Sequence, residues 1–136
     1  MSHGTVVWWD RHAGGRLAVL LLLALAAVAC REANGGEPRY RIAGAEPARG
    51  KVAIQRYGCG SCHTIPGVDG ADGLVGPPLT SWSRRTYVAG EVPNDPDHLV
   101  QWIQQPQAIE PGTAMPNLGV NAQDARDIAA YLYTIH

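Results

Sequence analysis

Residues 59–63 read Cys59-Gly60-Ser61-Cys62-His63, and this stretch decides what kind of fold the chain can adopt. Two residues between the cysteines place both sulfur atoms on the same side of a tight helical turn. The sulfurs can then form thioethers with the two vinyl groups of one porphyrin, while His63 turns its imidazole to the iron. C-x-x-C-H is the pattern of c-type haem attachment, so the stretch predicts one covalent haem c held through Cys59 and Cys62. Gly60 is expected to keep the turn free of bulk against the haem edge.

Two other chemistries use a pair of cysteines with this spacing. A thiol–disulfide redox pair is expected within a strand–helix–strand unit, which the sequence does not indicate, and it would leave His63 without a role. A structural zinc site needs a second pair of Cys or His ligands at zinc spacing, and none follows. The sequence therefore favours haem over both alternatives.

The chain offers one candidate for the sixth ligand of a haem iron. Its two methionines are Met1 and Met115, and Met115 lies 52 residues after His63, in the segment Pro-Gly-Thr-Ala-Met-Pro of residues 111–116. Methionine is the usual partner of histidine in electron-transfer haem. Pro116 biases Met115 toward an extended backbone and helps to stiffen the loop. We therefore interpret Met115 as an iron ligand together with His63, rather than as a core-filling side chain.

The composition excludes several classes of protein. The chain has 136 residues with 16 Gly and 10 Pro, so it is neither a coiled coil nor a bundle of long helices. Its 11 basic and 12 acidic residues leave a net charge of −1, so the chain lacks the excess of positive charge that is typical of nucleic-acid-binding proteins. The chain has no Phe, so a haem would supply apolar mass at the centre of a small domain. No catalytic triad or paired carboxylates stand out, and we expect no enzymatic activity.

The N-terminal residues are typical of a targeting segment. Residues 17–29 are uniformly apolar and follow Arg11 and Arg16, but these 13 residues are fewer than a membrane span requires. Small residues at Ala27–Ala29 stand directly before Cys30, an arrangement similar to the cleavage box of bacterial lipoproteins. We therefore predict that Cys30 is lipidated. An ordinary cleaved signal and an uncleaved anchor remain alternatives, and all three place the rest of the chain outside the cytoplasm.

The remainder of the chain divides into a tether and a folded unit. Residues 31–45 are polar and rich in glycine, without apolar periodicity, which is typical of a flexible segment. The predicted organisation is a signal peptide over residues 1–29, a flexible tether over residues 30–45 and a domain over residues 46–136.

Apolar periodicity predicts three helices in this domain. They are expected over residues 47–57, 96–105 and 122–135, with a short helical turn near 80–86. Pro47 opens the first helix, Asp95 and Asn121 cap the second and third, and Pro106 ends the second. No segment shows a convincing strand alternation, so the rest of the domain is expected to be loop.

With its haem motif and its Met115 loop, the sequence from Gly50 to Tyr133 resembles the class I c-type cytochromes. It looks especially like the small bacterial monohaem cytochromes, similar to the cytochrome c domains associated with haem–copper oxidases. The resemblance implies an all-α cytochrome c fold, in which three main helices and loops wrap around one covalently attached haem.

The resemblance also implies roles for individual pocket residues. The carbonyl group of Pro77 would accept a hydrogen bond from His63 and set its tautomer. Gly50 and Tyr131 match the crossing point of the first and last helices. The other implied haem contacts are Leu79 at a haem edge, Arg85 beside a propionate, Trp102 beside the methionine ligand and Thr113 at the inner propionate. Trp82 and Tyr87 are expected in the pocket or the core, and a bond from Tyr87 to a propionate is an alternative.

The function implied by the resemblance is one-electron transfer in a respiratory chain, on the periplasmic side of the cell membrane. The expected partners are membrane-bound redox complexes: a haem–copper oxidase, a cytochrome bc1-type complex or a periplasmic dehydrogenase. Lys51 is the single lysine, so we expect docking through apolar and weakly polar contacts. Two alternatives remain open, a protein that binds or senses gas or peroxide after loss of Met115, and a fixed haem subunit of an oxidase or dehydrogenase complex.

Overall fold

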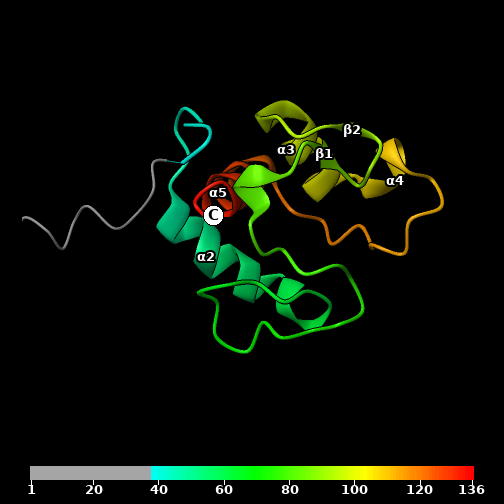
Figure 1. The fold of residues 1–136 in the computed structure, drawn as a ribbon, viewed down its shortest axis with the longest axis horizontal. Coiled ribbons are helices and arrows are strands. Elements are labelled where there is room, and N and C mark those ends of the chain that lie inside the picture. The colour runs from blue at the N-terminus through cyan, green and yellow to red at the C-terminus, as the bar shows by residue number, and fades with distance from the viewer. Residues whose placement is uncertain (1–37) are drawn as a thin grey trace, which may run out of the picture. The chain divides into compact units, whose positions relative to one another are not determined.

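A computed structural model describes residues 38–136, and Figure 1 shows how their helices are arranged. The predicted signal peptide, the predicted lipidation site at Cys30 and the first part of the predicted tether lie outside the described residues. Within residues 38–136, no helix is both long and apolar enough to cross a membrane.

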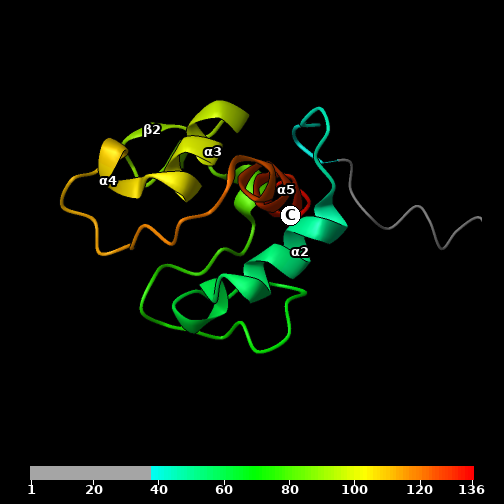
Figure 2. The same cartoon turned by 180° about the vertical axis from the view of Figure 1, so that it is seen from behind.

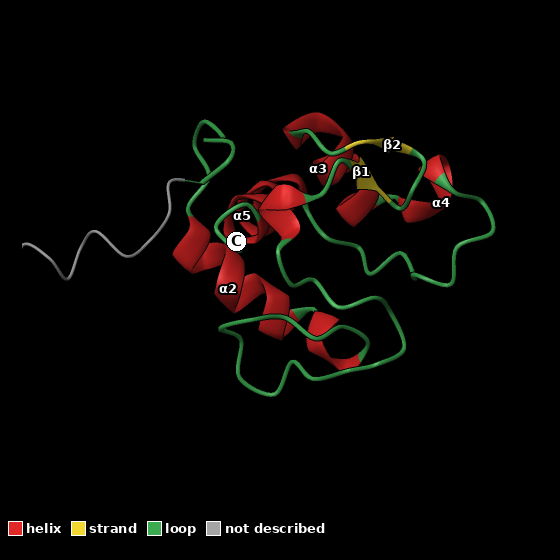
Figure 3. Ribbon diagram, in the orientation of Figure 1, coloured by secondary structure: helices red, strands yellow, loops and turns green. Residues whose placement is uncertain are grey.

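The described part of the chain is mostly helical, as predicted, and long loops connect the helices (Figure 3). In chain order the elements are the helix α2 (Pro47–Arg56), the 3-10 turns η1 (Cys59–Ser61) and η2 (Trp82–Arg84), the strands β1 (Tyr87–Val88) and β2 (Val92–Pro93), and the helices α3 (Pro96–Gln104), α4 (Pro106–Ile109) and α5 (Ala122–Leu132). The three helices predicted from periodicity are α2, α3 and α5, and the turn expected near residues 80–86 is η2.

The predicted helix caps are present. The side chain of Asp95 accepts a hydrogen bond from the backbone N–H of His98 at 3.0 Å, and that of Asn121 accepts one from Asp124 at 2.9 Å. Each bond satisfies a donor that the first turn of a helix leaves free. Pro106 follows the end of α3, as expected, but it also opens α4, because a proline suits the first position of a helix.

A two-stranded antiparallel pair is, together with α4, an element that the sequence does not predict. Val88 pairs with Val92, and Ala89 and Gly90 make the turn between them with φ angles of 55° and 83°. Each strand has two residues, which is too short to show an alternation of apolar and polar side chains. Val88 is fully buried, so the pair closes one side of the core.

The helices α2 and α5 cross at Gly50, and they lie against each other in both Figure 1 and Figure 2. A Cβ atom at Gly50 would lie 2.0 Å from the backbone oxygen of Asp127, so only glycine allows this approach. The predicted crossing partner Tyr131 lies four residues after Asp127 on α5 and packs against the core. Its hydroxyl donates to the carbonyl oxygen of Pro66 at 2.7 Å, which ties the end of α5 to the loop after His63.

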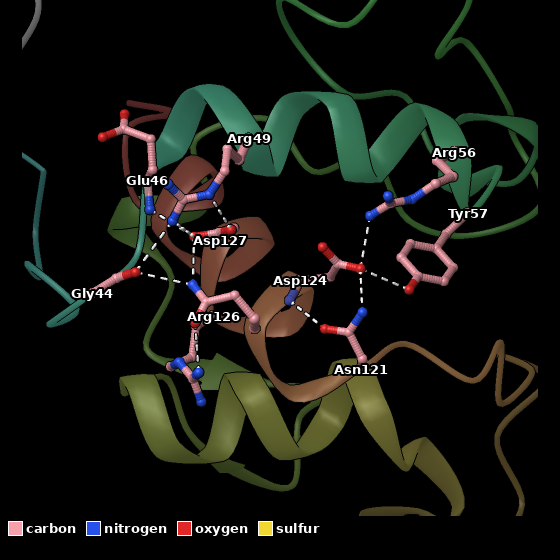
Figure 4. A network of polar contacts seen from close by, with 10 residues as sticks. Gly44, Glu46, Arg49, Arg56, Tyr57, Asn121, Asp124, Arg126 and Asp127 are labelled. Atoms are coloured by element: carbon pink, nitrogen blue, oxygen red, sulfur yellow. Dashed lines mark hydrogen bonds and ion pairs between the residues drawn. The ribbon is translucent and has the colours of Figure 1, made fainter.

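Two carboxylates of α5 hold α2 beside this crossing (Figure 4). Asp127 is buried and accepts hydrogen bonds from Nε of Arg49 at 2.8 Å and from the backbone N–H of Glu46 at 2.7 Å. Asp124 accepts a hydrogen bond from the hydroxyl of Tyr57 at 2.8 Å and pairs with Arg56 at 2.7 Å. The two ends of α2 are therefore each fastened to α5 by one carboxylate.

The described residues before α2 pack on the helices, so the folded unit begins earlier than the predicted boundary at residue 46. Tyr40 meets Tyr133 edge to face with ring centroids 4.9 Å apart, and Ile42 packs against the core. Arg39 donates to the carbonyl oxygens of Ser83 and Arg85 at 3.2 and 2.6 Å. Residues of the predicted tether thus make contacts with the helices that a polar composition does not reveal.

Candidate functional site

Cys59 and Cys62 lie on η1 and its end, directly after α2. Gly58 adopts a φ of 70°, which turns the chain out of α2, and the backbone N–H of His63 donates to the carbonyl oxygen of Cys59 at 3.0 Å. Both cysteines are half-buried, and they form no disulfide with each other. One tight turn thus presents two sulfur atoms and an imidazole, the three groups that the haem motif requires.

The structure gives no support to the two alternative chemistries. Burial raises the pKa of the Cys59 thiol, whereas a thiol–disulfide redox site works through a lowered pKa. Among the described residues, no group of three or more His, Cys, Asp or Glu side chains is placed to hold a metal ion such as zinc.

The imidazole of His63 is held by the loop that follows it. Its Nδ1 atom lies 2.8 Å from the carbonyl oxygen of Pro77, so the hydrogen bond expected from the resemblance is present. The backbone N–H of Gly76 donates to Cys62 at 2.8 Å, and that of Leu79 donates to Thr64 at 2.8 Å. The loop is therefore fastened on both sides of Pro77.

Gly76 is the glycine that makes room for the His63 ring. A Cβ atom at Gly76 would lie 2.3 Å from Cε1 and 2.6 Å from Nδ1 of His63, so any larger residue would displace the imidazole. Gly60 also makes room for the loop, and its predicted role at the haem edge stays a prediction. A Cβ atom there would lie 2.7 Å from Ala71, so Gly60 is small because the loop packs against it.

Met115 lies in the loop between α4 and α5, and its backbone is fixed on both sides. Its N–H donates to Oγ1 of Thr113 at 3.2 Å, and its carbonyl oxygen accepts from the side chain of Gln107 at 2.7 Å. The hydroxyl of Thr113 is used here as an acceptor, so its own hydrogen is still available for a propionate. Gln107 is a residue that sequence reasoning missed, since a glutamine on a short helix carries no signal.

Trp82 provides an independent test of whether these residues fit a haem. Its side chain is 4% exposed, and its indole Nε1 is the buried side-chain N or O atom of the described residues that lacks a hydrogen-bond partner. Leaving such a donor unpaired costs ~1–3 kcal/mol, so an acceptor is expected there. The guanidinium of Arg85 lies over the same indole ring at 4.9 Å, and it donates to the carbonyl oxygens of Pro78 and Thr80.

A haem carries two carboxylates, which match this set of donors. Burial lowers the pKa of the Arg85 guanidinium, and a neighbouring carboxylate would favour its charged form. The half-buried guanidinium and the unpaired indole N–H therefore fit the propionate role that the resemblance assigns to Arg85.

The remaining predicted contacts have different surroundings. Leu79 and Trp102 are half-buried and pack against the core, so each keeps an exposed part that a cofactor could cover. Tyr87 is 56% exposed and lies on β1 opposite Pro93, so it is not part of the core, and its place in the haem pocket stays a prediction. Asn94, which sequence reasoning did not single out, is buried and accepts from the hydroxyl of Tyr133 at 3.0 Å.

Comparison with known proteins agrees with the geometry. The family model described as cytochrome c matches residues 47–136. Two similar curated proteins are both cytochrome c oxidase subunit 2. The one from Alkalihalophilus pseudofirmus is 28% identical over 88 residues, which are 64% of this chain and 25% of that protein. The one from Bacillus subtilis is 28% identical over 87 residues, which are 62% of this chain and 24% of that protein. The chain thus spans about a quarter of the length of these relatives.

Proposed function

The chain belongs to the cytochrome c family, and from that premise we propose that it is a one-electron carrier with His63 and Met115 as the axial ligands of its haem. Membership of this family establishes haem-based electron transfer, with the haem attached covalently through Cys59 and Cys62. When bound, the haem supplies the redox chemistry. The chain supplies the iron ligands, buries the haem and determines how far solvent can reach it.

The hydrogen bond between His63 and Pro77 is the observation that best supports the proposal. A carbonyl oxygen only accepts, so Nδ1 carries the proton and Nε2 keeps its lone pair for iron. The same bond fixes the plane of the ring and makes the imidazole a stronger ligand. A histidine held in one tautomer and one orientation beside the two haem-attachment cysteines suits a permanent iron ligand.

The fixed backbone around Met115 supports its role as the second axial ligand. The hydrogen bond that Met115 donates to Thr113 and the one it accepts from Gln107 limit how far the loop can move, which protects a weak iron–sulfur bond from being lost. A histidine–methionine pair and a buried haem both raise the reduction potential, since both disfavour the ferric form.

Optical spectroscopy of the haem-loaded protein tests this ligation. The ferric protein should show the far-red charge-transfer band of a methionine–iron bond, and Met115→Ala should abolish it. Leu118→Ala, in the same loop, is the matched control and should keep the band. Absence of the band in the unaltered protein at neutral pH, with rapid binding of CO to the ferrous form, would favour the alternative of a gas-binding or sensing protein.

We further propose that the carrier serves a respiratory chain, with a haem–copper oxidase as its electron acceptor. The similar proteins named cytochrome c oxidase subunit 2 support this partner. A bc1-type complex or a periplasmic dehydrogenase would act as the donor. Purification in mild detergent separates a shuttle from a fixed subunit, because a fixed subunit would remain with its complex.

The proposed location is the periplasmic face of the cell membrane, with a lipid anchor on Cys30. The apolar segment of residues 17–29 and the small residues before Cys30 support it. Mass spectrometry of the mature N-terminus tests this proposal. An unmodified peptide that contains residues 1–29 would contradict both lipidation and simple cleavage.

A further inference from the structure

Arg39 lies before the part of the chain that matches the cytochrome c family, which is residues 47–136, yet its side chain reaches the turn η2. Its Nη1 atom donates to the carbonyl oxygens of Ser83 at 3.2 Å and of Arg85 at 2.6 Å. A helical turn leaves the carbonyl groups at its C-terminal end without partners inside the turn, and a cationic side chain can satisfy them. Arg39 therefore holds the end of the turn that carries Trp82 and leads into Arg85.

The side chain of Asn94 holds the same stretch of main chain. Its amide nitrogen donates to the carbonyl oxygen of Arg85 at 3.0 Å and to that of Trp82 at 3.2 Å. A carbonyl oxygen has two lone pairs, so Arg39 and Asn94 can bind Arg85 at the same time. Asn94 is 2% exposed, whereas Arg39 is exposed. The main chain at Arg85 is thus held by one donor from the core and by one from the surface.

Aromatic packing fixes the position of Arg39 itself. Its guanidinium lies 5.2 Å from the centroid of the Tyr40 ring, within the range of a cation–π contact. Tyr40 packs edge to face on the buried Tyr133, and the hydroxyl of Tyr133 donates to Asn94 at 3.0 Å. The two side chains that bind the carbonyl group of Arg85 are therefore connected to each other through Tyr40 and Tyr133.

We propose that Arg39 is a positioning residue of the haem site, which holds the main chain at Arg85 so that the guanidinium of Arg85 meets a haem propionate. The inference rests on the proposed function and adds the segment before α2 to the haem site. The negative charge of a propionate favours ferric haem, and a guanidinium beside it offsets that charge and raises the reduction potential. Arg39 would thus raise the potential through Arg85, without binding the haem itself.

The redox equilibrium of the holoprotein with a reference couple tests the proposal, because it reports the potential without any protein partner. Arg39→Met removes both hydrogen bonds and should lower the ratio of ferrous to ferric haem about threefold or more at a fixed ambient potential. Arg39→Lys should retain the ratio, because one nitrogen of Arg39 makes both bonds and an ammonium group can replace it. Arg84→Met is the matched control. It removes the same charge from an exposed position of η2 and should change the ratio little.

A double-mutant cycle tests whether Arg39 acts through Arg85. In a protein that already carries Arg85→Met, the further change Arg39→Met should alter the ratio little, because the group that Arg39 positions is gone. Two independent effects would instead add. Thermal unfolding of each holoprotein is measured beside the ratio, so that a change of stability is separated from a change of potential.

Three results would overturn the inference. They are an unaltered ratio in Arg39→Met, an equal change in Arg84→Met, and a full effect of Arg39→Met in the protein that lacks Arg85. A lower stability of Arg39→Met with an unaltered ratio would assign Arg39 a structural role only. The far-red band is recorded on the same samples. Its absence from the unaltered protein would contradict the ligation by Met115, whereas the cycle would still decide the role of Arg39.

Discussion

The Nδ1 atom of His63 lies 2.8 Å from the carbonyl oxygen of Pro77, and the backbone of Gly76 passes directly beside the same ring. The bond fixes the tautomer of the imidazole, and the glycine provides the space that the ring occupies. The two contacts together place one nitrogen of His63 where it can serve as a ligand, and they depend on two residues that touch no iron themselves.

Gly76→Ala should weaken the bond between His63 and iron. The new Cβ atom would lie 2.3 Å from Cε1, so the ring must move and its bond to Pro77 is lost. Loss of such a supporting contact lowers metal affinity about 10- to 100-fold, so a proton should displace His63 at a pH about one to two units higher. Acid titration of the low-spin haem spectrum measures this pH. Gly112→Ala is the control, because its Cβ atom would meet the flexible end of Glu110, and an equal shift there would contradict the prediction.

Trp82→Phe should raise the pKa of a haem propionate. The substitution keeps the aromatic bulk but removes the indole N–H, which is buried and without an acceptor in the protein. A carboxylate that loses a hydrogen-bond donor is less stable in its charged form, so its pKa rises. The inflection in the curve of reduction potential against pH should move to higher pH. Tyr87→Phe is the control, and a shift there instead would restore the alternative of a bond from Tyr87.

The positions of α2, α3 and α5 could be predicted from sequence, because proline, capping side chains and apolar periodicity are local signals. Asp95 and Asn121 cap the helices that they were expected to cap. The strands β1 and β2 could not be predicted, since two residues show no period. The packing of Tyr40 on Tyr133 joins residues far apart in the sequence, and no local pattern reveals it.

For the site, the sequence identified the groups that carry the chemistry, while the structure identified what supports them. The spacing of Cys59, Cys62 and His63 is a local signal that favours haem attachment over a thiol redox pair or a zinc site. The unpaired indole of Trp82 and the bond from Gln107 to Met115 depend on tertiary contacts. The sequence also did not distinguish Trp82, which is buried, from Tyr87, which is exposed and outside the core, because the burial of an aromatic side chain depends on tertiary packing.

Gly50→Ala should strongly destabilise the protein. Its Cβ atom would lie 2.0 Å from the backbone oxygen of Asp127, and the backbone of α5 cannot yield as a side chain would. Overpacking of this kind costs ~1–3 kcal/mol or more, which thermal unfolding of the holoprotein measures. Val52→Ala on the exposed face of α2 is the control and should change the stability little. A stability equal to that of the unaltered protein would mean that the helices do not cross at Gly50.

Asp127→Asn should lower the stability at neutral pH but not in acid. The hydrogen bond from Arg49 holds the pKa of the Asp127 carboxyl below its ordinary value, with burial acting against it. A lowered pKa in the folded state stabilises the protein above the unfolded pKa of ~3.9, and this contribution is lost as the pH falls through the folded pKa. The difference between the two proteins should therefore be ~1–2 kcal/mol at pH ~7 and should vanish in acid. Denaturant unfolding at a series of pH values measures it, with the exposed Asp69→Asn as the control. A difference that stays constant from neutral pH into acid would mean that the charge of Asp127 contributes nothing to the fastening of α2 to α5.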